Sequence, residues 1–108
     1  KMSVLWLSVD DNPGPSSDRA YIERNMIGLL AGMNGAVDLP SKQWLGNYSP
    51  EEGIQTSGLW NLDHLDHEYS PEFLDIFNEY VSITVGEIAK PKNSIAPKDW
   101  HTDLKNNV

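Results

Sequence analysis

The sequence predicts a small α+β domain that is mainly helical and carries one strand at its N-terminus. An apolar run over residues 3–9 has the length of a strand, and segments 18–31 and 71–82 have apolar residues at helical spacing after capping residues. A chain of 108 residues suffices for one domain with a modest core. We therefore expect a single domain over residues 1–88 and a peripheral tail over residues 89–108.

The predicted strand reads SVLWLSV and is stopped by the loop DDNPGPSS. Its residues are apolar on both faces, with Leu5 and Leu7 on one face and Val4 and Trp6 on the other. Such a strand is expected to be covered on both sides. The candidate second strand in the chain is VSITV, at residues 81–85.

The first predicted helix covers residues 18–31. Ser16 or Ser17 is expected to cap its N-terminus, and Asp18 suits the positive end of the helix dipole. Gly32 is expected to end it.

Two further segments begin with Ser-Pro-Glu. The first, SPEE at residues 49–52, predicts a short helix that stops near Gly58. The second predicts a longer helix over 71–82, with Phe73 and Phe77 on its apolar face.

A glutamate interrupts the apolar face of the first helix. At about 100° per residue, an arc about 180° wide holds six apolar residues, and Glu23 and Arg19 fall inside that arc. These six are Ala20, Ile22, Met26, Ile27, Leu29 and Leu30. A carboxylate on such a face needs a cationic partner, a metal or a water-filled cleft. Two interpretations stay open: an i, i+4 ion pair between Arg19 and Glu23, and a divalent metal held by Glu23.

Charge and composition restrict the partners. The net charge is −8, and the chain has no Lys or Arg between Gln43 and Ala89, where nine acidic residues lie. Such a surface repels phosphate backbones and favours a basic protein partner. The absence of cysteine excludes disulfides and thiolate metal sites. No apolar run is long enough to span a bilayer and no signal-peptide pattern is found, so we expect no membrane partner and a cytoplasmic location.

Two histidines lie in the acidic stretch DHLDHE, at residues 63–68. His64 and His67 could bind Zn²⁺ or Ni²⁺, but the stretch offers no defined third ligand. A solvated acidic turn is the favoured interpretation, and the sequence assigns neither histidine a role.

A strand like SVLWLSV, then a loop, then a helix with YIERNMIGLL resembles the second half of the GIY-YIG nuclease domain. It is most similar to the end of that domain in the excision-repair incision endonuclease and in GIY-YIG restriction enzymes. The family helix has the form Leu-Leu-Glu-x-Asn-x-Ile, which residues 21–27 match. The resemblance covers residues 3–46, and residues 47–88 would be a helical extension. The family's glutamate binds the single catalytic divalent metal, which implies that Glu23 binds Mg²⁺ or Mn²⁺.

The chain departs from the family pattern because it contains no GIY, YIG or YVG triplet. The family's two strand tyrosines and its helix arginine precede the strand with which this sequence begins, so the resemblance implies a C-terminal fragment. Additional site residues would then come from this chain's own side chains. These candidates are Arg19, Asn25, Gln43 and Asn47, with Asn34 as a further candidate for the asparagine that follows the family helix.

The resemblance implies phosphodiester hydrolysis by a metal-dependent endonuclease. DNA would be reached through the missing N-terminal part, and this chain would supply the metal-binding Glu23 and be inactive alone. The alternative is a non-catalytic acidic protein-interaction module, in which Arg19 and Glu23 form a structural pair and the acidic middle faces a basic protein.

Overall fold

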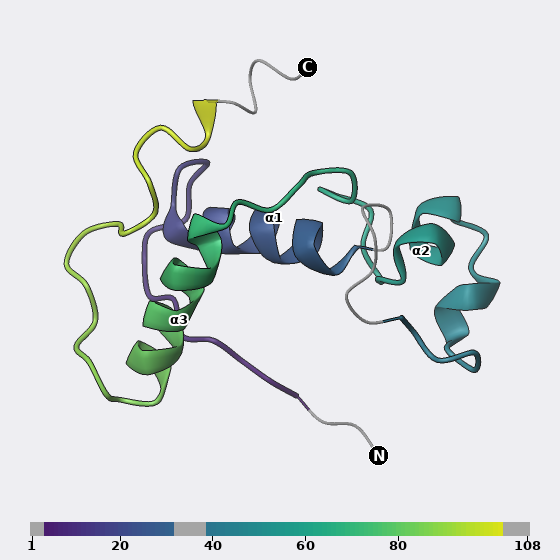
Figure 1. Cartoon of the computed structure of the whole chain (residues 1–108), viewed down its shortest axis with the longest axis horizontal. Coiled ribbons are helices and arrows are strands. Elements are labelled where there is room, and N and C mark those ends of the chain that lie inside the picture. The colour runs from purple at the N-terminus through teal and green to yellow at the C-terminus, as the bar shows by residue number, and fades with distance from the viewer. Residues whose placement is uncertain (1–3, 32–38, 103–108) are drawn as a thin grey trace. The chain divides into compact units, whose positions relative to one another are not determined.

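The computed structural model describes residues 4–31 and 39–102, and within them the chain is mainly helical (Figure 1). The elements are α1 (Asp18–Leu30), the 3-10 helix η2 (Leu45–Tyr48), α2 (Glu52–Ser57) and α3 (Glu72–Thr84). They belong to two compact units. Unit 1 comprises Lys1–Ile22 and Pro71–Val108, and unit 2 comprises Glu23–Ser70, so α1 contributes to both.

The predicted α+β class is wrong, because residues 4–31 and 39–102 contain no β-strand. A strand is stable only when a second strand accepts its hydrogen bonds. The candidate partner at 81–85 instead continues α3 as far as Thr84. The N-terminal run is not covered on both sides either, since Val4 is 79% exposed and Leu5 97% exposed. It is attached to α3 by Ser8, whose N–H donates to the Thr84 hydroxyl at 2.9 Å.

Both long helices form close to the predicted positions. The Ser17 hydroxyl accepts the Ala20 N–H at 3.2 Å, so Ser17 caps α1 as predicted. A second cap, missed in the sequence, comes from Asp11, whose Oδ2 accepts the Asp18 N–H at 2.8 Å. Gly32, the predicted stop, lies outside the described residues.

The short helix α2 ends where predicted. Gly58 follows it with φ of +77°, a left-handed conformation that glycine adopts without strain. The two Ser-Pro-Glu segments do not cap their helices as predicted. The N-cap residues of α2 and α3 are Glu51 and Pro71, and neither makes a side-chain capping hydrogen bond.

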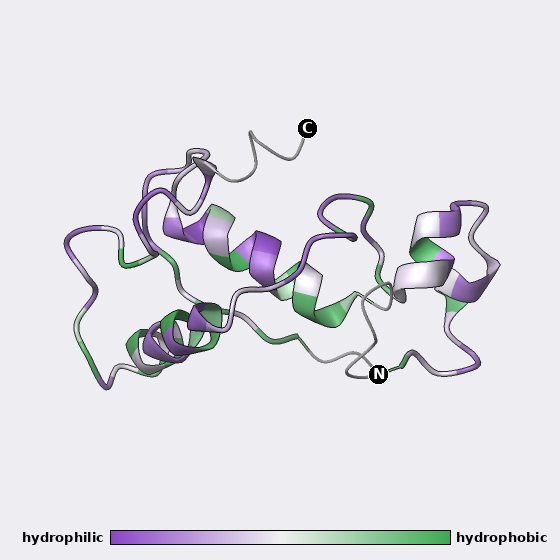
Figure 2. Cartoon of the chain, turned by 45° about the horizontal axis from the view of Figure 1, so that its top comes forward, coloured by the Kyte–Doolittle hydropathy of each residue, from purple (hydrophilic) through white to green (hydrophobic). Residues whose placement is uncertain are grey.

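The buried face of α1 is not the apolar arc that the helical wheel predicted. Asp18, Tyr21 and Asn25 are 0%, 2% and 4% exposed, whereas Leu30 is 38% exposed. Glu23, placed inside the predicted arc, is exposed. Hydrophilic and hydrophobic residues alternate along α1 in Figure 2. The helical-wheel prediction was wrong because it considered only apolar residues. On the face that is buried, two polar side chains, Asp18 and Asn25, are buried and hydrogen-bonded.

The core of unit 1 is organised around the Asp18 carboxylate. It accepts the hydroxyl proton of Tyr80, the Ile95 N–H at 2.9 Å and the Ala96 N–H at 3.0 Å. Tyr21 packs beside it, edge to face with the ring of Trp100 at 5.3 Å. The start of α1, the end of α3 and the C-terminal segment therefore meet at one carboxylate.

Unit 2 is held by the later turns of α1 and by aromatic packing near α2. The Asn25 side-chain oxygen accepts the Ser70 N–H at 2.7 Å. The rings of Trp44 and Trp60 meet edge to face at 5.2 Å. At Gly28, α1 lies so close to the backbone of His67 that a Cβ would be 2.5 Å from the His67 carbonyl oxygen.

Replacing Tyr80 by Phe is expected to lower the free energy of unfolding by about 1–3 kcal/mol, because buried Asp18 loses a donor. Urea unfolding measures the change. Tyr48→Phe is the control, since Tyr48 is 79% exposed. Equal stability of Tyr80→Phe and wild type would contradict the importance of this hydrogen bond.

Replacing Gly28 by Ala is expected to destabilise the protein, although alanine improves helix propensity by about 1 kcal/mol. The new methyl would overlap the His67 backbone, and such overpacking costs about 1–3 kcal/mol. Gly14→Ala is the matched control, because its Cβ would meet nothing within 4 Å. A higher melting temperature for Gly28→Ala would show that the close approach is not real.

Candidate functional site

Glu23, the predicted metal ligand, lies in the second turn of α1 with its side chain exposed. Within residues 4–31 and 39–102 its carboxylate makes no hydrogen bond or ion pair that would occupy it. The predicted Arg19–Glu23 pair is not what the structure shows. Arg19 instead binds Asp11, with Nε at 2.7 Å from Oδ1. Asp11 is the better partner because it also caps the helix that carries Arg19.

Two other predicted site residues form hydrogen bonds with backbone groups, and a third is exposed to solvent. Asn25 is buried and its side-chain oxygen holds Ser70. Asn47 donates from its amide to the carbonyl oxygens of Ser41 and Lys42, both at 3.2 Å. Gln43 is exposed, and Asn34 lies outside the described residues.

A divalent metal at Glu23 would have fewer than three His, Asp or Glu ligands, since the described part of the chain contains no group of three such side chains placed to hold an ion. Mg²⁺ and Mn²⁺ fit such a position, because a hard cation of this kind keeps several waters and needs only one or two carboxylates. The exposed Glu23 leaves room for those waters.

The two histidine rings contact each other, and His67 also contacts α1. Their rings lie 5.3 Å apart, and Arg24 donates from Nε to Nδ1 of His67 at 3.3 Å. Burial, then the positive charge of Arg24, lowers the pKa of His67, while Asp66 acts in the opposite direction. Both contacts favour the neutral ring, so His67 serves as a hydrogen-bond acceptor for Arg24.

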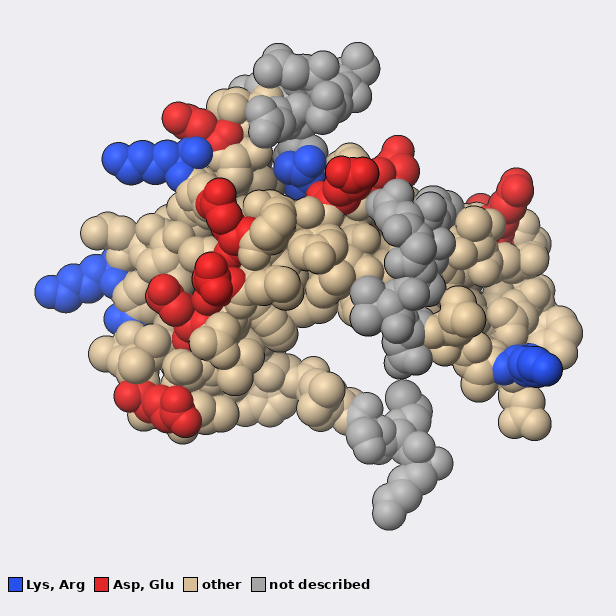
Figure 3. All heavy atoms as spheres, viewed as in Figure 1, with Lys and Arg blue, Asp and Glu red and all other residues tan. Residues whose placement is uncertain are grey.

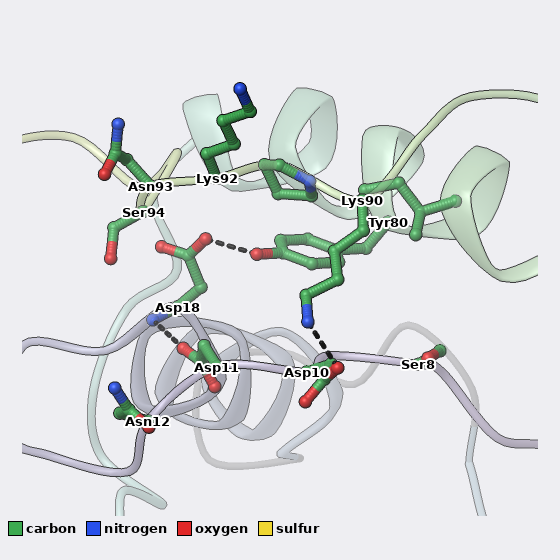
Figure 4. A pocket seen from close by; sticks show the side chains of 12 residues that line it. Ser8, Asp10, Asp11, Asn12, Asp18, Tyr80, Lys90, Lys92, Asn93 and Ser94 are labelled. Atoms are coloured by element: carbon green, nitrogen blue, oxygen red, sulfur yellow. Dashed lines mark hydrogen bonds and ion pairs between the residues drawn. The ribbon is translucent and has the colours of Figure 1, made fainter.

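A polar cavity of about 540 Å³ in unit 1 was missed in the sequence (Figure 4). Its walls come from the loop before α1, from α3 and from the segment after it. The lining residues are Ser8, Asp10, Asp11, Asn12, Asp18, Tyr80, Ile83, Lys90, Pro91, Lys92, Asn93 and Ser94. Because its walls lie up to 86 residues apart in the chain, no local pattern could reveal the cavity; the acidic pair at 10–11 and the basic stretch KPKNS at 90–94 were the available signals.

Two aspartates of the cavity, Asp10 and Asp11, form ion pairs with basic side chains. Lys90 forms an ion pair with Asp10 at 2.5 Å, and this hydrogen bond, followed by the lysine charge, lowers the pKa of Asp10. Burial, then the hydrogen bond and charge of Asp18, raises the pKa of Tyr80 far above its usual value. Tyr80 therefore stays protonated at neutral pH and acts as a donor.

The chain belongs to the GIY-YIG family: the family model described as the GIY-YIG domain matches residues 1–86. The resemblance inferred from the helix motif is confirmed, and the match extends past residue 46 through α3. Comparisons with curated proteins and with solved structures gave no significant match. In the part of the chain that the structure describes, no helix has the length and apolarity needed to cross a membrane.

Acidification is expected to destabilise the protein through His67. Because folding lowers its pKa, the unfolded chain takes up the proton first, and stability is full above the ordinary pKa of 6.5 and falls as pH drops below it. We expect less than about 1 kcal/mol per pH unit, since the side chain is 31% exposed.

Urea unfolding between pH 7 and pH 5 measures this change. His67→Asn keeps an acceptor for Arg24 but does not titrate, so the variant should lose less stability than wild type over that range. A wild-type curve that runs parallel to that of His67→Asn would exclude His67 as the source.

Proposed function

We propose that this chain carries the metal-binding helix of a GIY-YIG-type, metal-dependent DNA endonuclease domain, with Glu23 as the ligand of Mg²⁺ or Mn²⁺. The observation that carries the proposal is the family match over residues 1–86, which includes the Tyr-Ile-Glu-Arg-Asn segment. The exposed and unengaged Glu23 carboxylate supports it, because a ligand must be accessible to a hydrated ion.

Membership of the family makes a nuclease-like function the expected one. When bound, a divalent ion in such a reaction stabilises the charge that develops on the phosphate and its leaving oxygen. Glu23 would hold and orient that ion from a helix of 13 residues, which fixes its backbone better than a loop does. With Glu23 as a ligand, water and phosphate oxygens would fill the remaining coordination positions of the ion.

The chain alone is proposed to be inactive. Neither family triplet occurs in its sequence, so the strand tyrosines that activate the nucleophile have no counterpart. Tyr80 does not replace them, because its raised pKa and its hydrogen bond to Asp18 keep its proton in place.

The alternative is a non-catalytic acidic module that binds a basic protein, and the contacts of Arg19 support it less well. It required Arg19 to neutralise Glu23, but Arg19 is bound to Asp11. Glu23 is thus left without the partner that would have made it a stabilising residue, which favours the metal interpretation.

Replacing Glu23 by Gln is expected to weaken Mn²⁺ binding by at least about tenfold, because loss of even an indirect partner of a ligand typically costs that much. The measurement is paramagnetic broadening of backbone amide NMR signals during a Mn²⁺ titration. Glu79→Gln is the matched control, since Glu79 is an exposed helical glutamate on α3.

In the wild type, broadening should start at amides around Glu23 and spread outward with added metal. Broadening that is the same in Glu23→Gln as in Glu79→Gln would show that the ion binds diffusely to the acidic surface. The metal-site proposal would then be abandoned.

A further inference from the structure

Unit 2 leaves large apolar side chains exposed around η2 and α2. Leu45 is 74% exposed, Trp60 62% and Leu62 57%. Figure 3 shows the surface over η2 and α2 largely in tan, the colour of residues other than Lys, Arg, Asp and Glu. Apolar side chains that gather on a surface mark interaction sites, whereas apolar side chains exposed singly are ordinary.

Two contacts bring the residues before η2 beside the residues after α2. The rings of Trp44 and Trp60 meet edge to face at 5.2 Å. Near this pair in the chain, a Cβ at Gly58 would lie 3.1 Å from Cδ of Pro40. Segments that are separate in the sequence therefore contribute to one surface.

Trp60 presents a fixed aromatic ring to solvent. Its neighbour Trp44 packs on the backbone of Gly46, where a Cβ would overlap the indole ring. Because Trp44 is held in this way, the contact between the two rings also restrains Trp60. Within residues 4–31 and 39–102 the indole N–H of Trp60 makes no hydrogen bond, so this donor is available to a ligand.

Carboxylates without a cationic partner border this ring. Leu62 packs on α2, since its Cδ2 would lie 3.3 Å from a Cβ at Gly53. Glu52 precedes Gly53 and Asp63 follows Leu62, and both acidic residues are exposed. Neither carboxylate forms an ion pair or a hydrogen bond with the described part of the chain. The Trp60 surface, defined as Trp44, Trp60 and Leu62, is therefore apolar at its centre and acidic at its edge.

This combination selects the occupant by its charge. The sequence has no Lys or Arg between Gln43 and Ser70, so the chain itself offers the two carboxylates no basic neighbour there. A second copy of the chain fits poorly, because two molecules of net charge −8 repel each other. A basic segment of another protein matches both the carboxylates and the aromatic ring.

We propose that the Trp60 surface binds an arginine-containing segment of a partner protein. A guanidinium group stacks on the Trp60 ring and pairs with the carboxylate of Glu52 or Asp63, two contacts that arginine makes at the same time because it is planar. The Trp60 indole N–H donates to a backbone carbonyl of an extended segment. Such binding requires neither a metal at Glu23 nor nuclease activity, so the surface would recruit a partner to the domain.

The first test measures binding of a fluorescein-labelled peptide by anisotropy. The peptide has about ten residues, with arginine alternating with proline, because proline keeps a peptide extended. Trp60→Ala is expected to bind it at least about threefold more weakly. Trp6→Ala is the matched control, since Trp6 is 72% exposed in unit 1 and should change the affinity less than about 1.5-fold.

A second comparison tests the carboxylates without disturbing the aromatic pair, and it keeps the test valid if Trp60→Ala does not fold. Glu52→Gln/Asp63→Asn is expected to bind the peptide at least about threefold more weakly. Glu72→Gln/Glu79→Gln removes the same charge from exposed positions on α3 and should have a smaller effect. Circular dichroism checks the fold of each variant.

Three results would overturn the proposal. Failure of the wild type to bind the peptide is the first. An equal loss in the two double variants is the second, because binding would then follow net charge alone. The third is equal binding of a peptide with lysine in place of arginine, since an ammonium group lacks the planar face that stacks on Trp60; the lysine peptide is expected to bind at least about threefold more weakly.

Discussion

The buried carboxylate of Asp18 is the interaction on which unit 1 depends. Its side chain is 0% exposed, and burial of an ionised group costs several kcal/mol unless donors compensate it. Compensation comes from the Tyr80 hydroxyl and from the N–H groups of Ile95 and Ala96. Because these donors lie on α3 and on the C-terminal segment, the carboxylate fixes both against the start of α1. The cavity exists because of this arrangement.

The same constraint sets the rotation of α1. At the helical period Asp18, Tyr21 and Asn25 share one face of α1 and all three are buried, whereas Glu23 lies on another face and is exposed. Asn25 is tolerated there because its side-chain oxygen accepts the Ser70 N–H. Two satisfied polar groups therefore decide which face is buried, and the accessibility of Glu23 follows from them.

Local signals were enough to predict some of this structure. Capping by Ser17, the end of α2 at Gly58 and the positions of α1 and α3 follow from short-range chemistry. The family could also be predicted from the sequence, because residues 21–27 resemble its helix motif, and the family match confirms it. Features that depend on distant residues could not be predicted from local signals. The strand, the buried face of α1 and the cavity each depend on contacts between residues that lie far apart in the chain, such as the hydrogen bond from Ser8 to Thr84.

To act on a phosphodiester, as proposed, this acidic chain would have to supply positive charge locally. At physiological ionic strength, charges on the surface are screened over about 8 Å, so the distant carboxylates between Gln43 and Ala89 contribute less to binding than the groups in contact with the phosphate. In the proposed function, a divalent ion at Glu23 would be a local source of that charge. Such an ion would act on the reacting phosphate itself, so the net charge of −8 does not contradict the proposed nuclease function.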